Sequence, residues 1–343
     1  MLDEVVFGIS IFSLVFTAIG FLTPVALRFG LVDHPGGRKH HQGAVPLVGG
    51  IAIYLSLLVL LMIIGFPEKI LWLAVSSSLI VLTGLIDDAR GLGVKSRLIL
   101  QVLSTISMIY FGELWIKNIG IYSWSESFFF DFASLLTVIA VIGLTNAINL
   151  SDGIDGSAAT IVIVTITLLV VTANTYGEAL PNQRFVIGFG VAIFAFLIIN
   201  LGISPLRKVF LGDAGSLLLG YIVSWILIYY SQSPINGILP VAALWCVGIL
   251  VFDTISVIAI RVIQGRTPFS PDRIHLHHRL IDKCWSQKST LVVIFVITSL
   301  TNGLGIIVTY EVGQLAGFIL FFLCLALYIT RSYITLVRRE SVN

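Results

Sequence analysis

Apolar runs long enough to cross a bilayer recur along the whole chain, and this feature constrains the fold more than any other. The runs lie near residues 5–27, 47–66, 70–86, 98–112, 132–148, 158–175, 185–201, 214–230, 237–260, 290–310 and 315–330. A helix needs about 17 to 25 residues to span a hydrocarbon core. Charged residues make up only 11% of the chain, against about 25% in soluble domains. The sequence therefore predicts an all-α, polytopic transmembrane helical bundle with about eleven membrane-spanning helices.

The distribution of basic residues predicts the orientation of this bundle. If the N-terminus lies outside, all but three of the 20 Lys and Arg residues fall in inward-facing segments; the exceptions are Lys69, Lys117 and Arg184. Basic residues favour the cytoplasmic side of a membrane. We therefore expect the N-terminus outside and the C-terminus in the cytoplasm. No long linker divides the sequence, so residues 1–343 are expected to form one domain.

Five carboxylates lie at the predicted cytoplasmic ends of helices: Asp87, Asp88, Asp152, Asp155 and Asp213. An ionised carboxylate at the membrane boundary is unfavourable unless it is paired, hydrated or bound to a metal. The adjacent charges of Asp87 and Asp88 repel each other and favour a cation. Oxygen ligands without a nearby Cys indicate a hard ion, Mg²⁺ or Mn²⁺. Each acid taken singly, Asp152 or Asp213 for example, could instead cap a helix.

A long inward loop near residues 261–289 carries Arg273, His275, His277 and His278. A cation-rich loop with many hydrogen-bonding groups suits a diphosphate and a sugar. A zinc site and a surface for anionic lipid head groups are the alternatives. The sequence contains neither a GxxxxGK[ST] loop nor a GxGxxG motif, so it does not indicate an ATPase or a dinucleotide enzyme. Nucleic acid is not an expected partner.

Together these motifs resemble the polyprenyl-phosphate N-acetylhexosamine-1-phosphate transferase family. The similar segments are Asp87-Asp88 and residues 149–156, 210–216 and 274–278, in the family's order. Residues 38–50 and 268–273 look most like the bacterial branch that transfers GlcNAc-1-phosphate to undecaprenyl phosphate at the start of O-antigen and related polysaccharide synthesis. The phospho-MurNAc-pentapeptide branch fits less well, because Leu276 interrupts its three consecutive histidines. Teichoic-acid linkage enzymes stay open.

The resemblance implies that UDP-GlcNAc reacts with undecaprenyl phosphate and releases UMP, with Mg²⁺ or Mn²⁺ as cofactor. It implies that Asp87 and Asp88 orient or deprotonate the lipid phosphate, and that Asp213 and Asp155 hold the metal, with Asp152 as the alternative to Asp155. It also implies a bacterial inner membrane, with a periplasmic N-terminus. The residues expected to bind the nucleotide and sugar are Asn149, Asp152, Phe210, Arg273, His275, His277 and His278. The residues expected on the lipid-phosphate side are Lys39, Lys95 and Arg97. Membrane lipid is a further expected partner, and a homodimer is an expected assembly.

A transporter and a non-catalytic binding protein are the two alternatives to an enzyme. An ion-coupled or proton-coupled transporter would carry its acids near the bilayer midplane, beside broken helices, whereas these acids cluster at one predicted interface. A non-catalytic protein that binds the lipid carrier leaves the acidic cluster unexplained. The sequence therefore favours a membrane transferase.

Overall fold

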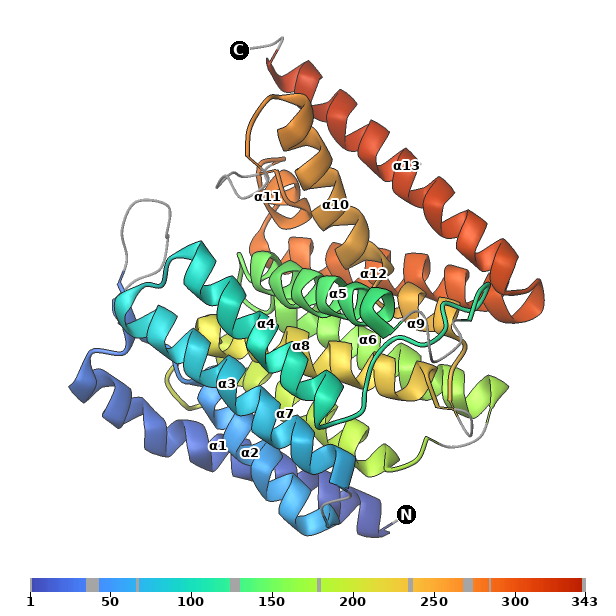
Figure 1. Cartoon of the computed structure of the whole chain (residues 1–343). Coiled ribbons are helices and arrows are strands. Elements are labelled where there is room, and N and C mark those ends of the chain that lie inside the picture. Colours follow the sequence, from blue (N-terminus) through green and yellow to red (C-terminus); the bar gives the residue numbers. More distant parts are fainter. Residues whose placement is uncertain are drawn as a thin grey trace.

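The computed structural model describes residues 2–34, 43–65, 68–123, 130–177, 180–233, 237–267, 274–283 and 285–340. These residues are nearly all helical (Figure 1). The helices are α1 (Leu2–Phe29), α2 (Gly49–Ile64), α3 (Glu68–Arg90), α4 (Val94–Tyr110), α5 (Phe130–Ser151), α6 (Ser157–Tyr176), α7 (Gln183–Asn200), α8 (Gly212–Ser231), α9 (Pro240–Cys246), α10 (Gly248–Ile263), α11 (Leu276–Ile281), α12 (Gln287–Glu311) and α13 (Gln314–Glu340). The short strands β1 (Val32–Asp33) and β2 (Val45–Pro46) pair antiparallel.

The chain is a polytopic helical membrane protein. Eight helices within the described residues are long and apolar enough to cross a membrane, and α9 with α10 makes a ninth span if the bent pair is counted once. Every predicted apolar run coincides with a helix or with this pair. The shorter α2 and α4 have 16 and 17 residues. The six-residue α11 lies in the loop before α12 and was not predicted from periodicity.

The ninth apolar run, predicted as a single helix, is broken into α9 and α10, whose axes differ by 70°. The break frees backbone groups that have no water partner inside a membrane. The carbonyl of Cys246 accepts hydrogen bonds from Thr165 Oγ1 and from Asn302 Nδ2, both at 2.9 Å. Asn302 Oδ1 accepts a third, from the backbone N–H of Ile249 at 3.1 Å. Side chains of α6 and α12 therefore stabilise the bend.

The central helix of the bundle is α8, in which 89% of the most apolar stretch is buried. Its first turn packs closely against α2 and α3 through small residues. A Cβ atom at Gly50 would overlap the backbone of Gly215, and one at Gly84 would overlap Ala214. Small residues allow membrane helices to approach this closely. The start of α8, which carries Asp213, is therefore fixed by two neighbouring helices.

Helix ends, some adjacent and others distant in sequence, meet at the two ends of the bundle. At one end, the end of α3 lies beside the start of α4, where Arg97 contacts Asp87 at 3.0 Å. The end of α5 and the start of α8 lie at this same end. At the opposite end, Glu4 near the start of α1 pairs with Arg184 near the start of α7 at 2.7 Å. The starts of α1 and α7 thus share one face, and the polar motifs gather at the other.

Candidate active site

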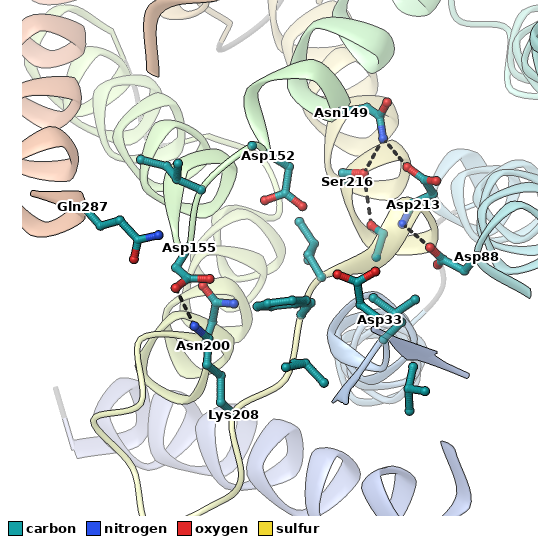
Figure 2. Close-up of a pocket in the computed structure, with 18 of the residues that line it drawn as sticks. Asp33, Asp88, Asn149, Asp152, Asp155, Asn200, Lys208, Asp213, Ser216 and Gln287 are labelled. Carbon is teal, nitrogen blue, oxygen red and sulfur yellow. Dashed lines mark hydrogen bonds and ion pairs between the residues drawn. The ribbon is translucent and has the colours of Figure 1, made fainter. Parts of the chain in front are cut away.

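A cavity of about 940 Å³ opens at the end of the bundle where α3, α5 and α7 terminate. All five carboxylates predicted from sequence line it: Asp87, Asp88, Asp152, Asp155 and Asp213. Asn149, Phe210 and His278 line it as well. Figure 2 shows Asp88, Asn149, Asp152, Asp155 and Asp213 approaching the same space from different helices and loops. The fold therefore brings three of the four sequence motifs together directly, and the histidine motif reaches the cavity through His278.

Asp88 caps the N-terminus of α8. Its carboxylate accepts hydrogen bonds from the backbone N–H groups of Asp213, at 2.8 Å, and Ala214, at 3.1 Å. A helix N-terminus has unsatisfied N–H groups and a positive dipole end, so a carboxylate is stabilised there. Gly212 has a φ of 72°, and a Cβ on it would lie 2.6 Å from Asp88 Oδ2. Glycine at this position permits both the backbone conformation and the approach of the carboxylate.

Asp213 is oriented by Asn149, which lies in the last turn of α5. The Asn149 amide donates to Asp213 Oδ1 at 2.6 Å and to Ser216 Oγ at 2.8 Å. The Ser216 hydroxyl in turn donates to the carbonyl of Gly212 at 3.1 Å. Asn149, which also contacts Ser216 of α8, therefore orients the Asp213 carboxylate at the cavity (Figure 2).

Asp152 lies between α5 and α6 in the most acidic part of the cavity. Burial raises the pKa of Asp152 well above its ordinary value, and the nearby carboxylates of Asp213, Asp155 and Asp88 raise it further. Both effects disfavour the charged form of the acid. A cation or a basic substrate group near Asp152 would act in the opposite direction.

The cavity also holds basic and polar residues that the motif analysis did not single out. Lys208 forms an ion pair with Asp155 at 2.5 Å, and its ammonium lies 5.2 Å from the centre of the Phe210 ring. Arg207 also lines the cavity and donates to the carbonyl of Ala44 at 2.7 Å. The only sequence signal for this basic pair is its position just before the 210–216 motif. Further lining residues that were not predicted include Asp33, Asn200, Ser216 and Gln287.

The residues expected on the lipid-phosphate side separate in the structure. Arg97 donates to Asp87 at 3.0 Å, and the backbone N–H of Leu92 donates to the same carboxylate at 2.7 Å. Lys95 is exposed in the first turn of α4 and is not among the cavity-lining residues. Lys39 and Arg273 lie outside the described residues.

The three histidines of the 274–278 motif occupy different positions. His278 lines the cavity. His277 is buried against the backbone of Gly153, where a Cβ atom would overlap its ring. His275 is buried and does not line the cavity; its Nδ1 lies 2.9 Å from Asp253 Oδ2. Asp253 lies within an apolar run, and no sequence motif marks it as a functional residue.

The comparisons with known proteins decide the family. The model of glycosyl transferase family 4 matches residues 70–231. The undecaprenyl-phosphate alpha-N-acetylglucosaminyl 1-phosphate transferase of Escherichia coli (strain K12) is 34% identical over 326 residues, covering 93% of this chain and 88% of the relative. This chain belongs to glycosyl transferase family 4. The predicted family resemblance is confirmed.

Two further relatives of this family 4 chain carry the same name. The protein of Yersinia pestis is 33% identical over 334 residues, covering 95% of this chain and 90% of the relative. The protein of Haemophilus influenzae is 31% identical over 319 residues, covering 92% and 90%. The similarity therefore extends over nearly the whole chain, including the cavity and the helices that surround it.

The metal-binding capacity of this family 4 site depends on oxygen donors. Within the described part of the chain, no group of three or more His, Cys, Asp or Glu side chains is arranged to hold a metal ion unaided. Mg²⁺ is commonly bound by one or two carboxylates together with substrate phosphate oxygens and water, rather than by a cage of protein ligands. Asp213 and its acidic neighbour Asp152 fit that pattern, because both line the cavity and no Cys or Met is among the described residues that line it.

Proposed function

We propose that the chain transfers GlcNAc-1-phosphate from UDP-GlcNAc to undecaprenyl phosphate, giving undecaprenyl-diphosphate-GlcNAc and UMP. The observation that carries this proposal is the meeting of five motif carboxylates with Lys208 and Phe210 in one cavity at a bundle end. The names of the relatives support the choice of donor and acceptor. The lipid-linked product would begin a cell-surface polysaccharide.

We propose that this single domain crosses a bacterial inner membrane eleven times, with its N-terminus outside and its C-terminus and active site in the cytoplasm. The Glu4–Arg184 ion pair supports this number of crossings, because it places the starts of α1 and α7 on the same face of the membrane. With α1 crossing once, the five helices from α2 to α6 must together cross the membrane an odd number of times. One crossing by each, including the short α2 and α4, meets that condition. Counting α9 with α10 as one crossing brings the total to eleven. The expected homodimer stays a prediction.

The donor nucleotide would occupy the part of the cavity near Phe210. The ring of Phe210 offers a stacking face for uracil, and Asn149 and Asp152 offer hydrogen-bonding groups beside it. Lys208 provides a positive charge next to this ring, where a diphosphate would be stabilised. The expected roles of Arg273, His275, His277 and His278 on the sugar and phosphate belong to the same proposal, with His278 the member that lines the cavity.

The acceptor phosphate would enter beside Asp87 and Asp88. This nucleophile is already an anion near neutral pH, so placing it in line and neutralising charge matter more than removing a proton. Asp87 is fixed by Arg97 and by the backbone of Leu92. Arg97 is therefore suited to balance charge at this edge, with Lys95 and Lys39 contributing to the approach of the lipid head group.

We propose that Asp213 and one neighbouring carboxylate hold Mg²⁺ or Mn²⁺ with the donor diphosphate. When bound, the cation supplies neutralisation of charge on the diphosphate and the leaving UMP. Asp155 is paired with Lys208, which favours Asp152 as the second carboxylate. That Asp155 is the second ligand remains a prediction. Substituting Asp152 and Asp155 one at a time shows which of the two binds the cation.

The proposed function is tested in membranes from cells that express the chain. UDP-GlcNAc, UDP-GalNAc and UDP-MurNAc-pentapeptide are offered side by side with undecaprenyl phosphate, and UMP and labelled lipid are measured. UDP-GlcNAc is expected to give both products, and membranes carrying Asp213→Asn serve as the matched control. Preferential turnover of another donor, or no UMP with any donor, would overturn the proposal.

A further inference from the structure

A buried polar cluster outside the cavity joins three separate parts of the chain. Its centre is Asp253 of α10, and Figure 1 shows α10 beside α13 with α11 near one end of α10. Asp253 Oδ2 contacts His275 Nδ1 at 2.9 Å, while Oδ1 accepts from the backbone N–H of Leu276 at 2.9 Å. Oδ1 also accepts from Arg279 Nη2 at 3.1 Å and from the Tyr328 hydroxyl at 2.9 Å.

Helix α13 contributes a second layer to the same cluster. Arg279 donates to the hydroxyls of Tyr328 and Ser332, and its guanidinium lies 5.1 Å from the centre of the Tyr328 ring. Tyr328 therefore contacts both Arg279 and Asp253. An Arg held by a carboxylate, two hydroxyls and an aromatic face has little freedom to move. These contacts attach the histidine motif to the last helix of the chain.

The side chains of the histidine motif connect this cluster to the cavity. The rings of His275 and His277 lie nearly parallel, with centroids 6.1 Å apart, and the centroids of His277 and His278 are 4.1 Å apart. His277 rests on Gly153, the residue after Asp152, and His278 lines the cavity. A shift of the motif would therefore move side chains that contact the loop after Asp152 or line the cavity.

We propose that Asp253 is a positioning residue that, with Tyr328 and Ser332 of α13, holds the histidine motif against the donor side of the cavity. Asp253 does not touch substrate; it acts through His275 and Arg279. A carboxylate paired to one nitrogen of an imidazole fixes the orientation of the ring and the nitrogen that carries the proton. This inference rests on the proposed function in that the motif borders the UDP-sugar.

The kinetic test compares Asp253→Asn, Asp253→Ala and Tyr328→Phe with the wild-type enzyme. KM for UDP-GlcNAc is expected to rise and kcat/KM to fall on the order of 10- to 100-fold for Asp253→Ala, the range typical of losing an outer partner of a functional histidine. Smaller losses are expected for Asp253→Asn, which keeps one acceptor oxygen, and for Tyr328→Phe. KM for undecaprenyl phosphate should stay unchanged, because the motif contacts Gly153, next to Asp152, whereas the acceptor is proposed to enter beside Asp87 and Asp88.

The matched control is Tyr310→Phe, which also removes a tyrosine hydroxyl, the one that accepts from the backbone N–H of Leu239 at 3.2 Å. Tyr310 borders a second cavity, lined by the end of α6 and the start of α13, away from the motif. Its kinetics are expected to match wild type. Because Asp253 and Tyr328 act on one motif, Asp253→Asn and Tyr328→Phe should combine non-additively in the double variant.

Hydrogen–deuterium exchange over residues 274–283 tests the inference without reference to turnover. Exchange there should be faster in Asp253→Asn and Tyr328→Phe and unchanged in Tyr310→Phe. If the wild-type enzyme releases no UMP but the motif exchanges faster in these variants, the proposed function fails and the positioning role stands. If the wild type is active while the Asp253 variants keep wild-type KM values and exchange, the positioning role is overturned. A fall in kcat alone, in proportion to lost folded protein, also overturns it.

Discussion

The carboxylate of Asp88 at the end of α3 accepts a 2.8 Å hydrogen bond from the backbone N–H of Asp213 at the start of α8. One motif acid therefore fixes the helix that presents another, although 125 positions separate them in sequence. The pair offers two functions for Asp88: a cap for α8 and a charge in the cavity. Substitutions can separate them because an amide keeps one of the two cap hydrogen bonds but none of the charge.

Asp88→Asn is expected to keep the fold and lose most of the activity. Asn keeps only one of the two oxygens that accept the backbone N–H groups of Asp213 and Ala214, so the free energy of unfolding should fall by about 1 to 2 kcal/mol. Loss of the charge should lower kcat on the order of 10²-fold, as removal of one strong electrostatic group does. Thermal unfolding in detergent and the rate of UMP release measure the two effects. If Asp88→Asn kept the wild-type kcat, Asp88 would act only as a helix cap.

Turnover is expected to require a divalent cation that Asp213 binds. EDTA should abolish UMP release, and Mg²⁺ or Mn²⁺ should restore it. Asp213→Asn should lower kcat on the order of 10²-fold or more and raise the Mg²⁺ concentration that gives half-maximal rate. Asn149→Ala, which removes the 2.6 Å hydrogen bond to Asp213, should produce a smaller shift in the same direction. Full activity in EDTA would show that Asp213 is not a metal ligand.

The effect of the cation on stability is expected to grow as pH rises. The raised pKa of Asp152 means that the folded protein binds this proton more tightly than the unfolded chain does. Without metal, this stabilising contribution is present at low pH and is lost as pH rises through the folded pKa. Mg²⁺ binds the ionised form and should oppose that loss.

Thermal unfolding from acidic to neutral pH, in EDTA and in Mg²⁺, measures this difference. Asp152→Asn should remove the growth of the Mg²⁺ effect with pH, whereas Asp155→Asn should retain it. If Asp155→Asn instead removes it and Asp152→Asn does not, Asp155 is the second carboxylate ligand.

The sequence predicts the acidic cavity well because each acid lies beside an apolar run and helix ends must collect at the membrane surfaces. It does not predict the role of Lys208, because a basic pair in a short loop is also expected from the positive-inside rule alone. Asp253 is missed for another reason: its partners His275 and Tyr328 lie 22 and 75 residues away. Only the packing of α10 on α13 brings them together.

The bend between α9 and α10 cannot be predicted from the sequence either. The residues at the break are Cys246, Val247 and Gly248, with no proline to interrupt the helix. The partners that satisfy the free backbone groups, Thr165 and Asn302, belong to other helices. Periodicity and composition therefore predict one span here, and tertiary contacts make it two helices.

Gly153→Ala is expected to reduce activity without unfolding the protein. The new methyl group would overlap the His277 ring, so the ring must shift relative to the exposed loop that carries Gly153. We expect kcat/KM for UDP-GlcNAc to fall about tenfold or more, since small displacements of positioning groups have effects of this size. Gly143→Ala is the control: its Cβ meets open space on α5 and should leave the kinetics unchanged. Equal kinetics in both variants would contradict contact between His277 and this loop.

Gly305→Ala tests whether the bend between α9 and α10 supports the active site. Gly305 of α12 lies against the indole of Trp245, and a methyl group there would overlap the ring. Trp245 is confined further, because its Nε1 donates to the carbonyl of Gly317 at 3.0 Å. Forcing extra volume into such packing costs about 1–3 kcal/mol. Since α9 leads directly into α10 and Asp253, we expect a lower Tm together with a raised KM for UDP-GlcNAc.

The control for this variant lies two residues earlier on the same helix. The nearest atom to a Cβ at Gly303 is Leu168 Cδ2 at 3.9 Å, an ordinary contact. Gly303→Ala should therefore be neutral, or more stable by up to about 1 kcal/mol because Ala favours a helix over Gly. A lower Tm for Gly305→Ala with an unchanged KM would mean that the bend supports the fold but not the donor site. Equal Tm values for the two variants would contradict the tight packing of Trp245 on α12.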